Sequence, residues 1–278
     1  MNKAAVLHQS DIFAANRARG VIAVGAEVVA GVTRRTVVRE EGSLRVRFPR
    51  PLAPALQAVI VNTAGGIAGG DRYDIACDAG AGADLTVSTA AAEKIYRSIG
   101  PDAEVSIQLS VEAGGALAWL PQETIFFDGA RLSRRIEVTL AEDASVLIAE
   151  GIVFGRSAMD EAVHTGSFVD RWRVKRGGTT VFAETVRLDG KLAARLAEPA
   201  VAGGNIALAT VLIAPGGDTQ VEAIRARGDD FRGEVGASAW NGFVLARLCA
   251  PDGAMLRHDL VTVLSALGRT TLPRLWAV

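Results

Sequence analysis

Residues 59–98 read VIVNTAGGIAGGDRYDIACDAGAGADLTVSTAAAEKIYRS, and this stretch indicates the type of fold. The apolar run at 59–61 has the composition of a strand and leads into a glycine-rich segment that ends at the charged pair Asp71 and Arg72. Residues 73–77 and 84–89 again read as strands, because apolar and β-branched side chains recur there between turn residues. The stretch therefore predicts strands joined by sharp loops, with no helix between them.

Four glycines, Gly65, Gly66, Gly69 and Gly70, lie within six residues of this stretch. A phosphate-binding P-loop requires Lys followed by Ser or Thr after its last glycine, whereas here Asp71 follows and would repel a phosphate. A dinucleotide-binding loop requires a helix that begins inside it, and none is indicated. We therefore interpret the four glycines as a structural loop, and we expect a positive φ at Gly66, at Gly70 or at both.

The two-residue period of half-buried strands recurs through most of the chain. Leu44, Val46 and Phe48 alternate with polar residues, as do the apolar residues of segment 105–111. Glycine- and aspartate-containing turns separate the strands, and almost no crossover helices lie between them. This pattern predicts a mainly β, many-stranded fold with few helices, although periodicity does not separate a sandwich from a β-helix or solenoid-like arrangement. Further candidate strands lie at 135–140, 145–152, 171–175, 180–188, 207–213 and 239–247.

One helix is predicted near the C-terminus. Asp252 is a candidate N-cap and Gly268 a candidate C-cap, and apolar residues recur between them at helical offsets. A second, short helix is predicted near residues 218–227. The apolar face of the C-terminal helix consists of Leu256, Leu260, Val263, Leu264 and Leu267.

Bulk composition limits the classes of protein to consider. The 278 residues, 49% of them hydrophobic, are expected to form a single domain over 1–278, with 1–30 only weakly assigned and 252–278 forming the C-terminal helix and tail. Thirty basic against 31 acidic residues give a formal charge of −1, so neither a nucleic-acid nor a membrane partner is indicated. No long apolar segment or secretion signal is recognisable, so we expect a cytoplasmic protein. Cys77 and Cys249 lie far apart and are expected to be buried thiols.

The residues that could carry chemistry are mostly carboxylates. His8, His164 and His258 form no metal-binding spacing with one another or with a cysteine, which excludes a recognisable structural zinc site. No GxSxG motif and no obvious nucleophile-base set is present, so we predict no enzymatic activity. A carboxylate in an otherwise apolar segment is either half of an ion pair or part of a polar channel. The candidates are Asp71, Glu93, Asp128, Glu150 and Glu184.

Several motifs together resemble one known family. In order, they are NTAGGIAGGDR, AAEKIYRS, WLPQETIFFDGARL, VFGRSAM, DRWRVKRGG, FAE and LGRTTLPRLW. This series is similar to the UreD family of urease accessory proteins, also called UreH, from about Thr33 to Trp276. Ser43, Ala90 and Asp160 depart from residues that are usual in the family, and Asp160 adds a carboxylate of unknown use. The resemblance implies a β-rich, helix-poor fold often described as a β-helix.

The resemblance also implies a function. A protein of this family would be a non-catalytic maturation factor that binds apo-urease, recruits a UreF-like accessory protein and, through it, a UreG-like GTPase that hydrolyses GTP. It would help to pass nickel to the urease active site, with no tightly bound cofactor and with nickel only in transit. Nickel prefers imidazole and thiolate to carboxylate ligands, so a chain with few of the former should conduct the metal rather than store it. The five carboxylates named above are then candidate weak nickel-transit residues.

Two questions stay open at the level of sequence. The rival function is a β-solenoid carbohydrate-active enzyme or binding module, although such proteins usually present aromatic rows and this chain is only 5% aromatic. The second question concerns the C-terminal helix and tail, which could bind the UreF-like partner or pack back on the chain's own core. The candidate partner-binding residues are Leu256, Leu260, Leu267 and Trp276.

Overall fold

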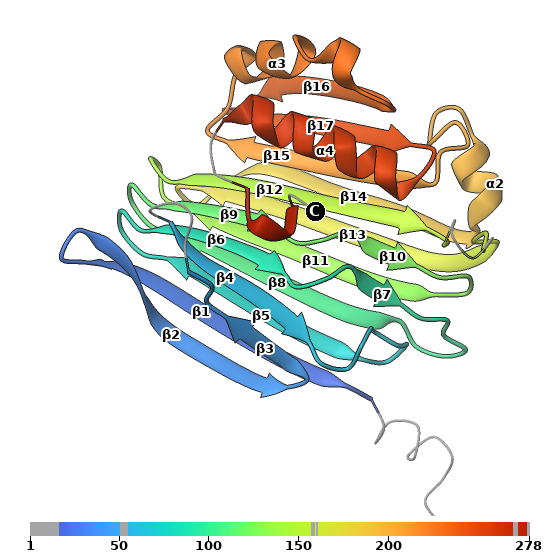
Figure 1. Ribbon diagram of the computed structural model, residues 1–278, viewed down its shortest axis with the longest axis horizontal. Coiled ribbons are helices and arrows are strands. Elements are labelled where there is room, and N and C mark those ends of the chain that lie inside the picture. The colour runs from blue at the N-terminus through green and yellow to red at the C-terminus, as the bar shows by residue number, and fades with distance from the viewer. Residues whose placement is uncertain (1–16, 51–54, 157–158, 160, 269–271, 277–278) are drawn as a thin grey trace, which may run out of the picture.

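The computed structural model describes residues 17–50, 55–156, 159, 161–268 and 272–276, which fold into two facing β-sheets with helices concentrated at one end (Figure 1). The prediction of a mainly β, solenoid-like fold with one helix near the C-terminus is confirmed. His8 and Asp160, both singled out from the sequence, lie outside the described residues. No helix within the described ranges combines the length and the apolar character needed to cross a lipid bilayer.

One sheet contains seven strands in the part of the chain that the structure describes, in the order β14-β13-β11-β8-β5-β1-β2. Strands β1, β5, β8, β11 and β13 pair in parallel, whereas the edge strands β2 and β14 pair antiparallel with their neighbours. The bounds are β1 Arg19–Val29, β2 Val32–Gly42, β5 Arg72–Ala79, β8 Ala103–Val111, β11 Arg131–Leu140, β13 Thr165–Arg176 and β14 Thr179–Lys191.

The facing sheet contains ten strands within the same described ranges, in the order β16-β17-β15-β12-β9-β6-β4-β3, with β10 paired to β12 and β7 paired to β10. Here β4, β6, β9 and β12 pair in parallel, and β15, β17 and β16 extend the sheet antiparallel. The bounds are β3 Leu44–Arg47, β4 Leu56–Asn62, β6 Asp84–Thr89, β7 Glu93–Ile95, β9 Ala116–Leu120, β10 Thr124–Phe126, β12 Ser145–Phe154, β15 Ala207–Ala214, β16 Glu234–Trp240 and β17 Phe243–Ala250.

Between β4 and β13 the chain winds as a flattened coil, because the longer strands alternate between the two sheets. The short strands β7 and β10 and the end of β12 pair in parallel and form a narrow third wall. Equivalent residues of successive turns stack in register inside this wall, and all of them are buried. The stack consists of Ile67, Ile95, Phe126 and Phe154.

Alternating side chains fill the space between the sheets, as expected of strands with one face in a core. Strand β12 differs, because nearly all of its residues are buried. Helices α3 (Asp218–Arg225) and α4 (Gly253–Leu267) belong to a second apolar cluster on the outer face of the ten-stranded sheet, and α4 packs against β12, β15 and β17. The long apolar run of β12 is therefore the signature of a strand that is covered on both sides.

Both predicted helices are present at the expected positions. Asp252 caps α4 by accepting a hydrogen bond from the Met255 amide at 2.8 Å, and Gly268 ends it in the left-handed conformation at φ 61°. Helix α3 lies where the short helix was expected. Helix α2 (Leu192–Ala197) was not predicted.

The prediction of a single strand at 239–247 is wrong. Strand β16 ends at Trp240 and β17 begins at Phe243, and the two form an antiparallel hairpin. Asn241 and Gly242 make the turn at φ values of 48° and 77°. An Asn-Gly pair suits the mirror-image turns of two-residue hairpins, because both positions require a positive φ.

The structural interpretation of the glycine-rich loop is supported by its backbone. Gly65, Gly66 and Gly70 have φ values of 78°, 151° and 87°, which confirms the positive φ expected at Gly66 and Gly70. Gly69 does not share this conformation, but a Cβ atom there would overlap the side chain of Ser98. At Gly66, Gly69 and Gly70 a Cβ atom would meet a neighbouring atom at 3.0 Å or less, whereas at Gly65 it would meet none. The loop therefore needs both the conformational freedom of glycine and its lack of a side chain.

Candidate functional site

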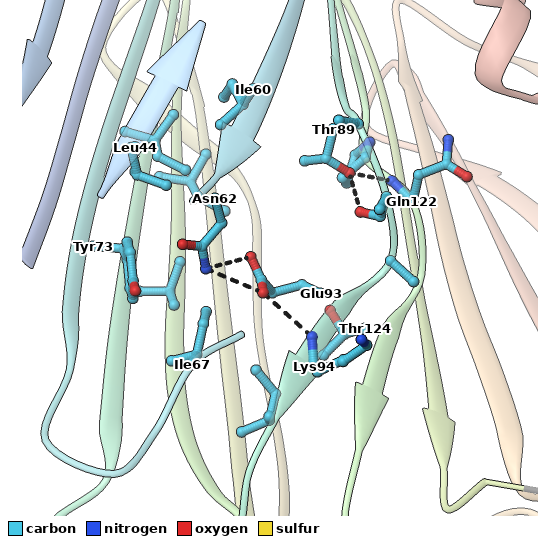
Figure 2. Close-up of a pocket in the computed structure, with 18 of the residues that line it drawn as sticks. Leu44, Ile60, Asn62, Ile67, Tyr73, Thr89, Glu93, Lys94, Gln122 and Thr124 are labelled. Atoms are coloured by element: carbon cyan, nitrogen blue, oxygen red, sulfur yellow. Dashed lines mark hydrogen bonds between the residues drawn. The ribbon is translucent and has the colours of Figure 1, made fainter. Parts of the chain in front are cut away.

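A cavity of about 240 Å³ lies between the two sheets. Its wall is mainly apolar, with contributions from Ile60, Ile75 and Ile107. Asn62 and Glu93 enter it from the ends of strands, whereas Arg134 and Glu150 enter it from within β11 and β12. Figure 2 shows Asn62, Tyr73 and Glu93 around this space.

Glu93 is one of the two carboxylates that line this cavity, and Glu150 is the other. Both of its carboxylate oxygens accept hydrogen bonds from Asn62 Nδ2, at 3.2 and 3.1 Å, and Oε1 also accepts from the Lys94 amide at 3.3 Å (Figure 2). No cation lies within ion-pair distance of Glu93 among the described residues. Burial raises the pKa of Glu93 above its usual range, and the Asn62 hydrogen bond only partly opposes this.

Arg134 and Glu150 form another part of the cavity wall, and together with Asp170 they make a buried ion cluster. Arg134 extends from β11 in one sheet to Glu150 on β12 in the other, and its Nη1 donates to Glu150 Oε2. The same guanidinium donates from Nε to Asp170 Oδ1 at 3.0 Å and from Nη2 to Asp170 Oδ2 at 2.6 Å. The cluster thus links the two sheets through one arginine side chain.

Two tryptophans complete the hydrogen bonding of this cluster. Trp119 Nε1 donates to Glu150 Oε1 at 2.7 Å, and Trp172 Nε1 donates to Asp170 Oδ2 at 3.0 Å. Burial raises the pKa of Glu150, against the opposing charge of Arg134. For Arg134, burial lowers the pKa but the charges of Asp170 and Glu150 outweigh it and raise the pKa above its usual value. The arginine is therefore held as a cation.

A second, larger cavity of about 720 Å³ begins on the other side of the cluster. Arg134 and Glu150 line both cavities, so the cluster is the wall between them. The second cavity extends to Glu234 and Arg247 on β16 and β17. Arg247 forms an ion pair with Glu184 of β14, which is an edge strand of the seven-stranded sheet. Of the predicted carboxylates, Glu93 and Glu150 thus line the first cavity and Glu150 also lines the second, whereas Glu184 lines neither and pairs with Arg247 at the partly exposed rim of the second.

The other two predicted carboxylates serve the backbone instead. Asp71 is buried and accepts hydrogen bonds from the amides of Ala18 and Ala68, at 2.8 and 2.7 Å. Asp128 accepts from the amides of His164 and Thr165, at 2.7 and 2.9 Å. The Thr165 hydrogen bond in particular lowers the pKa of Asp128. Neither residue lines either cavity.

The predicted partner-binding residues lie mostly inside the molecule. Leu256, Leu260 and Trp276 are buried, and Leu267 is half-buried. Trp276 Nε1 donates to the Leu120 carbonyl at 3.0 Å, and the guanidinium of Arg257 lies 4.7 Å from the centre of its ring. This packing favours a core role for α4 and the tail, so a direct partner contact stays a prediction.

Two members of the ion cluster, Arg134 and Asp170, were not selected from the sequence. Strand β11 alternates in and out, and Arg134 lies in the inward phase between Leu132 and Ile136. Asp170 likewise lies in the inward phase of β13, beside Trp172. A charged residue in the inward phase of a strand is the signal that would have found both.

Within the described ranges, the ion cluster included, no group of three or more His, Cys, Asp and Glu residues could hold a metal ion. Cys77 is buried and Cys249 is half-buried, and both are free thiols. The polar side chains that line the two cavities include carboxylates, arginines, Lys94, Tyr73, threonines and side-chain amides, and Cys249 lines the second cavity.

Comparison with known proteins identifies close relatives of the chain. The family model for the UreD urease accessory protein matches residues 18–277. The chain is 57% identical over 270 residues to the urease accessory protein UreD of Rhodopseudomonas palustris (strain ATCC BAA-98 / CGA009), a match that covers 97% of each protein. It is 56% identical over 267 residues to the urease accessory protein UreD of Bradyrhizobium diazoefficiens, covering 96% of each. With this extent of similarity, the chain belongs to the UreD family of urease accessory proteins.

Proposed function

We propose that the chain is a non-catalytic maturation factor of urease that carries nickel through its interior to the apo-enzyme. The family match over residues 18–277 supports a role in urease maturation. The observation that supports transit is the interior arrangement, in which Glu93 and Glu150 line one cavity and Glu150 lines the next.

The chemistry of the interior suits a metal that must keep moving. Carboxylate oxygens bind nickel more weakly than imidazole or thiolate, so isolated carboxylates spaced along a cavity would attract the ion without trapping it. Glu93 suits the entry position, because it is a half-buried carboxylate that forms no ion pair within the described residues, although the charge of the neighbouring Lys94 acts on it. An enclosed route would also keep the metal away from competing ligands in the cell.

The partners belong to the same proposal. A UreF-like accessory protein would dock on the chain and bring a UreG-like GTPase, which would supply GTP hydrolysis, while apo-urease would receive the metal. These events would take place in the cytoplasm. The family match favours this function over a carbohydrate-active enzyme or binding module, which no feature of the site supports.

The test uses Glu93→Gln in cells that co-express urease with its accessory proteins. We expect slower nickel-dependent activation of urease and unchanged co-purification with apo-urease, because the amide keeps the shape of the side chain but removes its charge. The matched control is Glu137→Gln, which changes an exposed carboxylate on the outer face of β11. Normal activation by Glu93→Gln, or no association of the unaltered chain with apo-urease, would contradict the proposal.

A further inference from the structure

The wall between the two cavities is made of charged side chains rather than apolar ones. Arg134 and Glu150 face both spaces, and Asp170 faces the second. The three side chains are each less than a tenth exposed. Anything that passes from one cavity to the other must therefore pass this cluster or displace part of it.

The cluster has unequal charges. Two carboxylates share one guanidinium, and the described residues supply no second cation within ion-pair distance of either. With both acids ionised, the cluster carries a net charge of −1 in the interior. Trp119 and Trp172 add hydrogen bonds but no charge. A buried excess charge is costly, so it is relieved either by a proton, in line with the raised pKa of Glu150, or by additional positive charge.

The geometry of Arg134 resembles that of a tethered cation between two carboxylates. Its Nη1 bonds Glu150 from one side and its Nε and Nη2 bond Asp170 from the other. A divalent cation in place of the guanidinium would neutralise both carboxylates, whereas a monovalent ion would leave the excess charge. The exchange therefore selects for divalent ions on charge alone.

We propose that Arg134 gates the route between the cavities, and that a divalent cation passes by exchanging with its guanidinium between Glu150 and Asp170. This inference rests on the proposed transit function and names the residue that regulates it. While Arg134 is in place, the cluster separates the two cavities, each of which has exposed residues at its rim. An arriving divalent ion would release the side chain into one of the two adjoining spaces.

The alternative is a purely structural ion bridge between the sheets. Removal of Arg134 would be destabilising in either case, because it leaves two buried carboxylates without a counter-charge. The two possibilities differ in their response to metal. A structural bridge needs the hydrogen-bonding geometry of arginine, whereas an exchange site accepts a divalent ion in its place.

The first experiment measures thermal unfolding of Arg134→Gln with and without Ni²⁺ at constant ionic strength. We expect a lowered Tm that Ni²⁺ raises by about 4 °C or more, an amount typical of a clear gain in stability for a chain of this size. In Arg134→Gln/Asp170→Asn, which carries one carboxylate less, Ni²⁺ should have little effect. The matched control is Arg171→Gln, which removes an arginine side chain from the exposed face of β13 and should leave the response to Ni²⁺ unchanged. A destabilised Arg134→Gln that does not respond to Ni²⁺ would overturn the proposal.

The second experiment uses Arg134→Lys, which keeps the charge and does not depend on the folding of a neutral variant. Lysine lacks the forked donors of arginine, so Ni²⁺ should displace it more easily and bind about tenfold more tightly than to the unaltered chain. Titration calorimetry gives the affinity. Quenching of Trp119 and Trp172 fluorescence, assigned with Trp119→Phe and Trp172→Phe, gives the position. Equal affinity without quenching of either tryptophan would refute exchange at this cluster.

The two proposals fail in different ways. Slower urease activation by Glu93→Gln, together with no metal response at Arg134, would keep transit and remove the gate. Binding of Ni²⁺ at the cluster, together with normal activation by both Glu93→Gln and Arg134→Lys, would keep the exchange site and remove the transit function.

Discussion

Glu93 gives the most direct prediction at the scale of one residue. Because burial raises its pKa, the ionised form is disfavoured in the folded chain, and the protonated form contributes stability that is lost as pH rises through the folded pKa. Glu93→Gln, which can still accept from Asn62, should therefore raise the Tm at pH 8. The difference from the unaltered chain should narrow towards pH 4. Thermal unfolding between these pH values measures both effects.

Asp128 provides a control of opposite sign. Backbone hydrogen bonds lower its pKa, so the ionised form contributes stability that is present at neutral pH and is lost as the pH falls through the folded pKa. Asp128→Asn should lower the Tm at pH 7, with less effect in acid. A pH-independent difference for both variants would show that neither carboxylate differs in pKa between the folded and unfolded chain.

Gly65 and Gly66 separate two reasons why a position in this loop requires glycine. Both have a positive φ, but a Cβ at Gly65 meets nothing within 4 Å, whereas at Gly66 it would overlap the Tyr96 ring and lie 3.0 Å from the Lys94 carbonyl. Gly65→Val should cost about 1 to 2 kcal/mol from backbone strain. Gly66→Val should cost more than about 2 kcal/mol, because the Lys94 carbonyl is fixed by a hydrogen bond from Ile67. Chemical denaturation compares them, and equal losses would exclude the steric contribution.

The candidate site was only partly accessible to sequence reasoning at this scale. Glu93 and Glu150 were selected because charge in apolar segments needs a partner, and both do line the interior cavity. The same reasoning selected Asp71, which bonds backbone amides, because sequence does not distinguish a carboxylate that caps a loop from one that lines a cavity. Arg134 was missed because long cationic side chains are normally assumed to reach solvent.

At the scale of the element, α4 is the clearest case for a stability test. Leu260 is completely buried on the outer face of the ten-stranded sheet, whereas Val261, its neighbour, is half-buried. Leu260→Ala should destabilise the chain by about 3 kcal/mol. Val261→Ala should cost much less. Similar losses for the two variants in chemical denaturation would contradict the observed orientation of the helix.

Truncation after Pro251 tests the same helix as a whole. It would expose the apolar outer surface of β15 and β17, so we expect insoluble protein. A soluble, folded truncation that no longer binds the UreF-like partner would instead support an interface role for α4 and the tail. A soluble truncation that still supports urease activation would defeat both interpretations.

Two signals in the sequence would have improved the prediction of elements. The Asn241-Gly242 pair marks the turn between β16 and β17, yet the alternating residues around it read as a continuous strand. A repeat of roughly 30 residues is also present, since Asp84, Ala116 and Ser145 stand in register on successive turns. The repeat is weak in residue identity because only the burial pattern has to recur.

At the scale of the whole molecule, the mainly β character could be read from the sequence but the division of strands between two sheets could not. Every strand with one buried face has the same two-residue period, whichever sheet it joins. Strand β12 was the exception, because its continuous apolar run reflects burial on both faces. The charged wall between the cavities could not be predicted from the sequence either, since Arg134, Glu150 and Asp170 come together only in the folded chain.

Unequal burial predicts unequal local stability across the molecule. Strand β2 is an edge strand that is exposed along nearly its whole length, whereas β12 is covered on both faces. Hydrogen exchange followed by mass spectrometry should show fast exchange in peptides from Val32–Gly42 and slow exchange in those from Ser145–Phe154. Comparable protection of the two would indicate that another copy or a partner covers β2.

The coiled path of the chain has a consequence for its synthesis on the ribosome. Strand β8 pairs with β5, and β11 pairs with β8, so each emerging strand finds its parallel neighbour already made. Growth from the N-terminus can thus proceed one turn at a time, although parallel pairing is slow for a free chain. Strand β15, which pairs with β12, and helix α4, which packs on its outer face, are translated after it, so the outer surface of β12 stays bare until then. Nascent chains stalled before Ala207 should therefore bind holdase chaperones, and release should follow once the last helix has left the exit tunnel.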